Sequence, residues 1–185
     1  MRQLLALLFF LLVCSSNPAA ATTVRYLDLD SLVHTSALIF HGTVEEVAAK
    51  NLGSAERPRL VTDVTFTVHR VLKGANPGCE FHLRLVGGSA DGHTLQIPGQ
   101  PRFRKGGEVV LFLESTGVEL VLNGMGQGRY RVGRDGEGRK LARRDLSGLS
   151  VVRRGRDSAT IEAGALEDAV PLEDLFRRVH DLQAR

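Results

Sequence analysis

Residues Val61–Leu72, VTDVTFTVHRVL, decide the fold class. Val64, Phe66 and Val68 alternate with threonine and histidine, so apolar side chains recur at every second position. A strand with one buried and one wet face has this period, and the β-branched content favours it. The stretch therefore predicts a half-buried β-strand.

Further strand signals recur along the chain and make the protein mainly β, some as the same alternation and others as compact apolar runs. Further strands are expected at 37–47, 81–85, 108–113 and 118–122, and a hairpin at 129–132 and 139–145 around the turn 135–138. Residues 87–107 form a long glycine- and proline-containing connection, of the kind that is either functional or poorly ordered.

Two helices complete the expected framework. A short one is predicted near 27–33, with Asp28 or Asp30 as its cap. An amphipathic one is predicted over about 171–183, where Pro171 suits the first helical position and apolar residues repeat at helical spacing. The order of strands suggests a small antiparallel β-barrel between these helices.

The first 21 residues are typical of a secretion signal. Arg2 is followed by an apolar run from Leu4 to Val13, and small residues end at Ala21. Cleavage there leaves 164 residues (185 less 21), which we expect to form one domain over 22–185. The chain is then exported to the periplasm or the exterior, and lipidation of Cys14 is the less favoured alternative because Val13 precedes it.

Charge and composition limit the classes of partner that we expect the mature chain to bind. The mature chain carries 23 basic and 21 acidic side chains, a formal charge of +2, and few aromatic residues for stacking on bases. We therefore expect no nucleic-acid partner. No later segment is apolar enough to span a membrane, and no motif requires a cofactor.

The order of landmarks resembles that of bacterial secreted proteins with an OB-like barrel. Those landmarks are Ala37–Val44, the strand Val64–Val68 with the turn at Lys73–Gly74, and the step Phe103–Leu113. They also resemble netrin-like domains, including tissue inhibitors of metalloproteinases. The resemblance covers about residues 37–132 and implies a small OB-like barrel.

One feature of those inhibitors is missing. They begin with Cys-x-Cys, which chelates the protease zinc, whereas the expected mature start here is Thr22-Thr23-Val24. The resemblance therefore supports the fold and transfers no inhibitory mechanism. A protease-inhibitor-like module stays an alternative function by resemblance alone.

A histidine cluster is the sharpest chemical hypothesis. His41 is placed on the wet face of its strand, and a register that sets His69 opposite His82 would put three imidazoles on adjacent strands. Such a cluster could hold zinc or copper, which makes a metal-binding protein or metalloenzyme the second alternative. A shift of one residue in register would scatter the three side chains over a polar surface.

A basic hairpin is the candidate partner surface. Ten basic side chains lie between Arg129 and Arg156. They are either a solvated hairpin or a surface for an anionic envelope component or an acidic exported protein. The side chains expected to carry this surface are Arg129, Arg131, Arg143 and Arg144.

We find no catalytic constellation. Ser89, Asp91 and His93 are close in sequence, but no nucleophile-elbow pattern surrounds the serine. The leading expectation is an exported, non-enzymatic binding or accessory module, with the long connection and the basic hairpin as the face to test first.

Overall fold

The computed structural model describes residues 22–154 and 159–184, and the predicted signal peptide lies outside them. The protein is mostly antiparallel β-sheet with two α-helices among these residues, as expected. The main sheet has the order β13-β10-β9-β7-β2-β3-β4, with β8 paired to β7. None of the described residues is in a helix long and apolar enough to cross a membrane.

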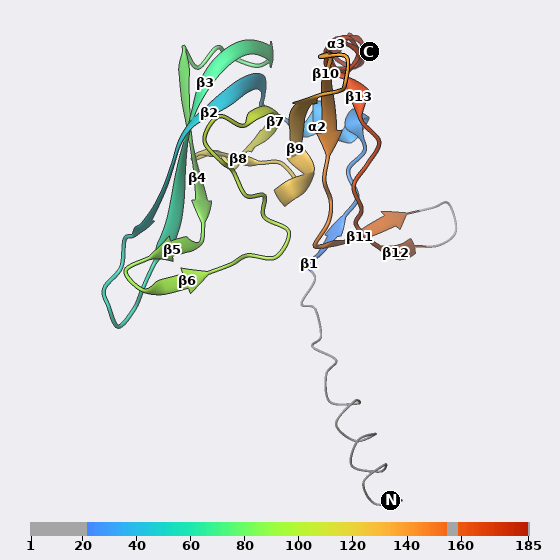
Figure 1. Ribbon diagram of the computed structural model, residues 1–185. Coiled ribbons are helices and arrows are strands. Elements are labelled where there is room, and N and C mark those ends of the chain that lie inside the picture. The colour runs from blue at the N-terminus through green and yellow to red at the C-terminus, as the bar shows by residue number, and fades with distance from the viewer. Residues whose placement is uncertain (1–21, 155–158, 185) are drawn as a thin grey trace, which may run out of the picture.

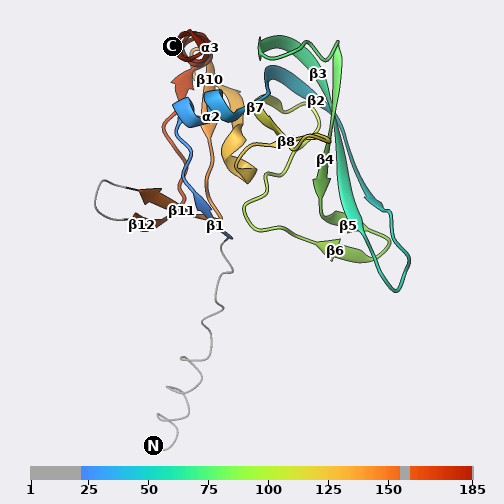
Figure 2. The same cartoon turned by 180° about the vertical axis from the view of Figure 1, so that it is seen from behind.

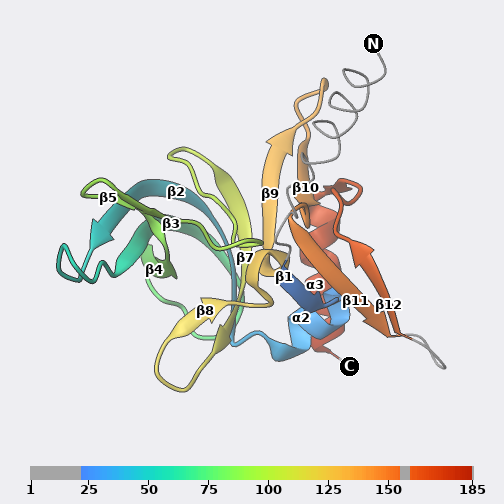
Figure 3. The ribbon, with the colours of Figure 1, turned by 90° about the horizontal axis from the view of Figure 1, so that it is seen from below.

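Two long strands and their neighbours form a strongly curled half of this sheet (Figures 1 and 3). β2 (Leu38–Asn51) pairs with β3 (Leu60–Lys73), which pairs with β4 (Glu80–Val86). β7 (Glu108–Ser115) lies on the other side of β2 and carries the short β8 (Leu120–Leu122). Period-two alternation predicted β2, β3 and β4, and compact apolar runs predicted β7 and β8.

The other half of the sheet carries the basic hairpin. β9 (Arg129–Arg134) pairs with β10 (Lys140–Arg144), whose far edge carries β13 (Val170–Pro171). A short 3₁₀ helix, η1 (Met125–Gly128), leads into β9. The hairpin is where the sequence predicted it.

The main sheet is buried on both faces at its central strands β2 and β7. One face packs inside the curl, around Phe40, Phe66 and Leu111. The opposite face packs beneath α2 (Leu29–Thr35) and α3 (Leu172–Gln183), around Ile39, Phe112 and other apolar side chains. Figure 2 shows both helices on the side of the molecule away from β3 and β4.

Both helices begin within two residues of the predicted starts, and Pro171 is the N-cap of α3 instead of its first helical residue. The Asp28 carboxylate accepts a hydrogen bond from the Ser31 amide at 2.8 Å and caps α2. Pro171 precedes the first residue of α3, whose first turn contains Glu173 and Asp174. Those carboxylates favour the positive end of the helix dipole.

The sequence predicted that one face of β2 is exposed to solvent, and this prediction is wrong at the beginning of the strand. Ile39 is fully buried and His41 is 7% exposed, because α2 and α3 cover that face. The helices come from the two ends of the described chain, so alternation within the strand contains no trace of them.

The expected closed barrel is not observed. The main sheet ends at β4 and β13 without joining its edges. Cα atoms of β4 and β8 come within 8 Å, but the described residues show no pairing between these strands. The curl therefore stays open at this seam.

Two smaller sheets were not predicted. β1 (Thr22–Arg25) pairs in parallel with β11 (Leu149–Arg154), which pairs with β12 (Ala159–Ala163). Within the long connection, β5 (Gly88–Ala90) and β6 (His93–Leu95) form a small hairpin. The rest of that connection runs between the curled sheet and the sheet of β1 and β11 (Figure 1).

Candidate functional site

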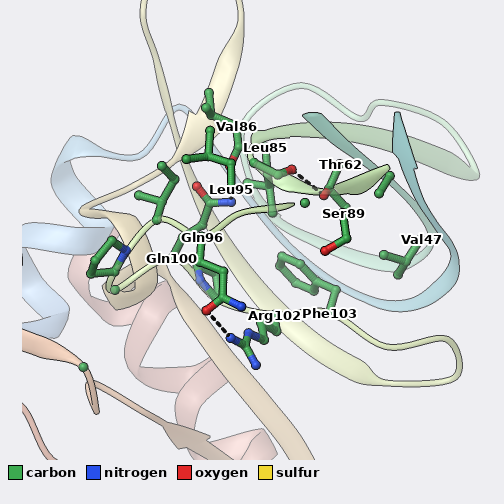
Figure 4. A pocket seen from close by; sticks show the side chains of 18 residues that line it. Val47, Thr62, Leu85, Val86, Ser89, Leu95, Gln96, Gln100, Arg102 and Phe103 are labelled. Carbon is green, nitrogen blue, oxygen red and sulfur yellow. Dashed lines mark hydrogen bonds between the residues drawn. The ribbon is translucent and has the colours of Figure 1, made fainter. Parts of the chain in front are cut away.

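The long connection forms one wall of a groove of about 720 Å³. The ends of β2 and β3 supply Val47 and Thr62, and the end of β4 supplies Val86. Leu95 and Phe103 line it from the connection itself, as Figure 4 shows. This volume is within the range of ligand-binding pockets.

The groove exposes aliphatic side chains that a folded chain normally buries. Val86 is 60% exposed, Leu95 42% and Val47 38%. Gathered in one concave place, such side chains are typical of a binding surface, whereas apolar residues scattered singly over a surface are ordinary.

Hydrogen bonds hold the connection in position over the groove. The Gln100 side-chain amide donates to the Val86 carbonyl at 2.8 Å, and Arg102 donates to the Gln96 side chain at 3.0 Å. The Thr62 hydroxyl donates to the Gly87 carbonyl at 2.7 Å. The groove wall is thus fixed to β3 and β4 by polar contacts.

A glycine contact lets the same connection approach the sheet of β1 and β11. Gly99 has a φ of +80°, and a Cβ there would lie 2.0 Å from the Leu149 Cδ2 atom. A Cβ on Gly126 would lie 2.6 Å from the Gly99 carbonyl oxygen. Only glycine fits this close approach at a left-handed position.

A second hollow, which we call the arginine pocket, adjoins the groove along Gly99–Arg102. It measures about 280 Å³, and Arg102, Arg129 and Arg131 line it together with Asp145 and Ser147. Three guanidinium groups against one carboxylate give the lining a formal charge of +2. The long connection and the basic hairpin therefore meet, which was expected only as two neighbouring features of one face.

The four arginines predicted as a partner surface have different environments. Arg143 is exposed. Arg131 is half-exposed and donates to Asp145 at 2.9 Å. Arg129 is 8% exposed and Arg144 is 2% exposed, so the expectation of four surface charges is wrong for these two.

Arg144 is a structural residue. It donates two hydrogen bonds to the Glu167 carboxylate, at 2.8 and 2.6 Å, and one each to the Leu27 carbonyl and the Tyr26 hydroxyl. This network joins β10 to the chain before α2 and to the segment before α3. A paired and fully hydrogen-bonded guanidinium is the form in which a buried charge is tolerated.

Arg129 has no such partner. Its Nη1 atom donates to the Arg102 carbonyl at 2.7 Å, and its guanidinium lies 5.6 Å from the centre of the Phe103 ring. Its Nε atom is buried and has no hydrogen-bond partner among the described residues. Burial, together with the positive charge of Arg131, lowers the pKa of Arg129 to about 10.

The predicted three-histidine metal site does not assemble. His82 lies opposite Thr65, so the register that would pair it with His69 is wrong. The pairing of β3 with β4 ends at Thr67 opposite Glu80, so His69 lies beyond the paired residues. Across residues 22–154 and 159–184, no three metal-ligating side chains lie close enough to hold a metal ion.

His41 and His69 are nonetheless neighbours, with ring centres 5.3 Å apart. His41 donates to the Glu108 carboxylate at 2.6 Å, and Lys140 donates to the same oxygen at 2.6 Å. Burial lowers the pKa of His41, and the hydrogen bond to Glu108 and its charge only partly oppose this. Burial alone would raise the pKa of Glu108, but hydrogen bonds from Lys140 and His41 outweigh it, so the pKa of Glu108 is lowered. None of the hollows described here includes this cluster, so we interpret it as part of the packing beneath α3.

Ser89 does not meet His93. Its hydroxyl forms a hydrogen bond of 2.9 Å with Thr94 across the β5–β6 hairpin, where Ala90 faces His93. The groove lining contains hydroxyl, amide and guanidinium groups and no carboxylate, histidine or cysteine.

Sequence reasoning missed one feature whose signal was present, the burial of Arg144. The alternation Ala142, Arg144, Leu146 points Arg144 to the apolar side of the hairpin. The length of the 87–107 connection was a sign of function, but its sequence does not identify which strands it would face. No family model, curated protein or solved structure matches the chain in the comparisons made with them.

Proposed function

We propose that this chain is an exported, non-enzymatic binding module, and that its groove binds an extended apolar peptide segment of another exported protein. The observation that carries the proposal is the concave cluster of exposed Val47, Val86 and Leu95 beside polar groups fixed on the long connection.

The lining suits a peptide because it mixes two kinds of groups. The aliphatic side chains can bury alternate side chains of an extended segment. The Gln96 amide nitrogen can donate to its main chain, and the Gln100 amide oxygen and the Thr62 hydroxyl oxygen can accept from it, beside the bonds that hold the connection. The arginines beyond Gly99 favour a partner that is acidic at one end.

The open curl is part of the proposal. We propose that β2, β3, β4, β7 and β8 form an OB-like barrel left open at the β4–β8 seam, as the sequence resemblance implies. The groove then lies at one end of this curl, where the long connection crosses it.

The test is a selection from random seven-residue peptides with free carboxyl ends, followed by fluorescence polarisation with the selected peptide. Val86→Asp and Leu95→Asp each place a charge where an apolar side chain should be buried. Loss of one buried aliphatic contact is worth about 1.5–3 kcal/mol. We therefore expect affinity to fall roughly 10- to 100-fold.

Val118→Asp is the matched control, because Val118 is 96% exposed and lies outside the groove. It should bind the peptide as the unaltered protein does. Equal affinity of all three variants, or failure to select any peptide that the groove variants weaken, would contradict the proposal.

A further inference from the structure

Arg129 is a buried cation that forms no ion pair with any residue the structure describes. No carboxylate of the described residues lies within 4 Å of its guanidinium, and its Nε atom has no acceptor. Asp145, the nearest acid on the same wall, is engaged by Arg131 and by the Ser147 amide. Leaving a buried charge unpaired is costly, so a protein rarely keeps one without a use for it.

Arg144 shows that this fold can neutralise a buried guanidinium when the role is structural. It lies on the opposite face of the same hairpin and has Glu167, the Tyr26 hydroxyl and the Leu27 carbonyl as acceptors. Arg129 faces a hollow instead, with Arg102 and Arg131 as neighbours. The contrast separates a structural arginine from one that has no acidic partner within 22–154 and 159–184.

The arginine pocket lies next to the groove, so a group bound in the pocket can belong to the ligand that occupies the groove. The groove and the arginine pocket share Gly99, Gln100, Pro101 and Arg102 as lining residues. They also meet at the turn 147–148, since Ser147 lines the pocket and Gly148 lines the groove. A ligand lying in the groove can therefore reach the pocket around this loop.

We infer that the arginine pocket binds an oxyanion group, a carboxylate or a phosphate, on the ligand whose apolar part occupies the groove. The inference rests on the proposed function. Guanidinium groups match both anions through paired N–H donors, and such charge-assisted hydrogen bonds are the stronger ones. One guanidinium is balanced by Asp145, which leaves two positive charges for the ligand.

The first test compares the selected peptide with a free carboxyl end and the same peptide with a carboxamide end. We expect the carboxamide to bind at least about tenfold more weakly, since a hydrogen bond to a charged group contributes about 1.5–3 kcal/mol. Arg131→Gln and Arg102→Gln should remove most of that difference. Both residues are partly or fully exposed, so the variants should fold even if a change at Arg129 does not.

Arg143→Gln is the matched control. It removes the same charge from the same hairpin, but Arg143 does not line the pocket. If Arg143→Gln weakens binding as much as Arg131→Gln does, long-range attraction accounts for the effect and the pocket assignment is overturned.

Titration with inorganic phosphate and with acetate, followed by amide chemical shifts, separates the two sources of the anion. Saturable shifts at Arg129 and Arg131 that Arg131→Gln abolishes would support the pocket even if no peptide binds, in which case the proposed function fails alone. Equal binding of carboxyl and carboxamide peptides, with the Val86→Asp loss intact and no phosphate shifts, would overturn the inference while leaving the proposed function standing.

Discussion

Replacing each buried arginine of the hairpin by methionine should affect stability in different ways. Methionine has a similar length and no charge, so it keeps most of the packing of the side-chain stem. Arg144→Met removes the guanidinium donor from the Leu27 carbonyl, the Tyr26 hydroxyl and the Glu167 carboxylate, and leaves Glu167 with the Tyr26 hydroxyl. Arg129→Met leaves one carbonyl, that of Arg102.

The magnitudes follow from the contacts. Removing one partner of a buried ion pair costs about 3–5 kcal/mol, and the Glu167 side chain is 29% exposed, so we expect about 3 kcal/mol for Arg144→Met. For Arg129, a pKa of about 10 corresponds to a charge penalty on the order of 3 kcal/mol at neutral pH. The lost hydrogen bond to Arg102 offsets most of that gain, so Arg129→Met should change stability by less than about 1 kcal/mol.

Urea denaturation of the protein from residue 22 onward measures both values, provided that the slope against urea is unchanged. Arg143→Met, at an exposed position on the same hairpin, should stay within about 0.5 kcal/mol of the parent. If Arg129→Met lost as much stability as Arg144→Met, Arg129 would be a structural residue and the reasoning for a ligand-binding role would be refuted.

Two further predictions concern the sheet and its cluster of charges. Gly42→Ala should destabilise by about 1–3 kcal/mol, because the added Cβ would lie 2.5 Å from the Thr67 carbonyl oxygen, whereas Gly133→Ala meets nothing within 4 Å and should be neutral in the same urea titration. Because the pKa of His41 is lower in the folded chain, protonation favours unfolding, and stability should fall as the pH drops through the ordinary histidine value of 6.5. The lowered pKa of Glu108 adds a further loss below about pH 4.5. His41→Gln should reduce the loss between pH 7.5 and 5.5, and an equal loss in parent and variant would show that other groups titrate.

Most strands of the main sheet were predictable because each carries a local signal in its own sequence. β3 and β4 alternate, β7 is a compact apolar run, the turn 135–138 marks the β9–β10 hairpin, and Asp28 and Pro171 mark the starts of the helices. These are local signals, so they do not depend on what packs against the element. They were sufficient for the fold class and for most of the main sheet.

The site was not predictable in the same way, since it depends on contacts between distant parts of the chain. His82 is placed by the register of β3 with β4, which starts at Thr67 opposite Glu80 and which alternation within either strand does not determine. Ile39 and His41 are buried by helices at the two ends of the described chain. Arg144 forms its ion pair with Glu167, which is 23 residues further along the chain on a segment with no periodic pattern.

The arginine pocket depends both on local alternation and on a contact between distant parts of the chain. Arg129 and Arg131 share one face of β9 by simple alternation, and Arg143 pairs with Arg131 across the hairpin. That Arg129 is covered by the long connection depends on the Gly99 contact, which no local pattern reveals. The sequence therefore indicates the basic hairpin but cannot separate its buried arginines from its exposed ones.

The most direct measurement is a map of amide chemical-shift changes on titration with the selected peptide that has a free carboxyl end. The groove and the arginine pocket should respond together, with Val86, Leu95, Arg129 and Arg131 shifting along one saturation curve. Shifts confined to the exposed hairpin turn 135–138 or to α3, with Val86 and Arg129 unmoved, would contradict the account.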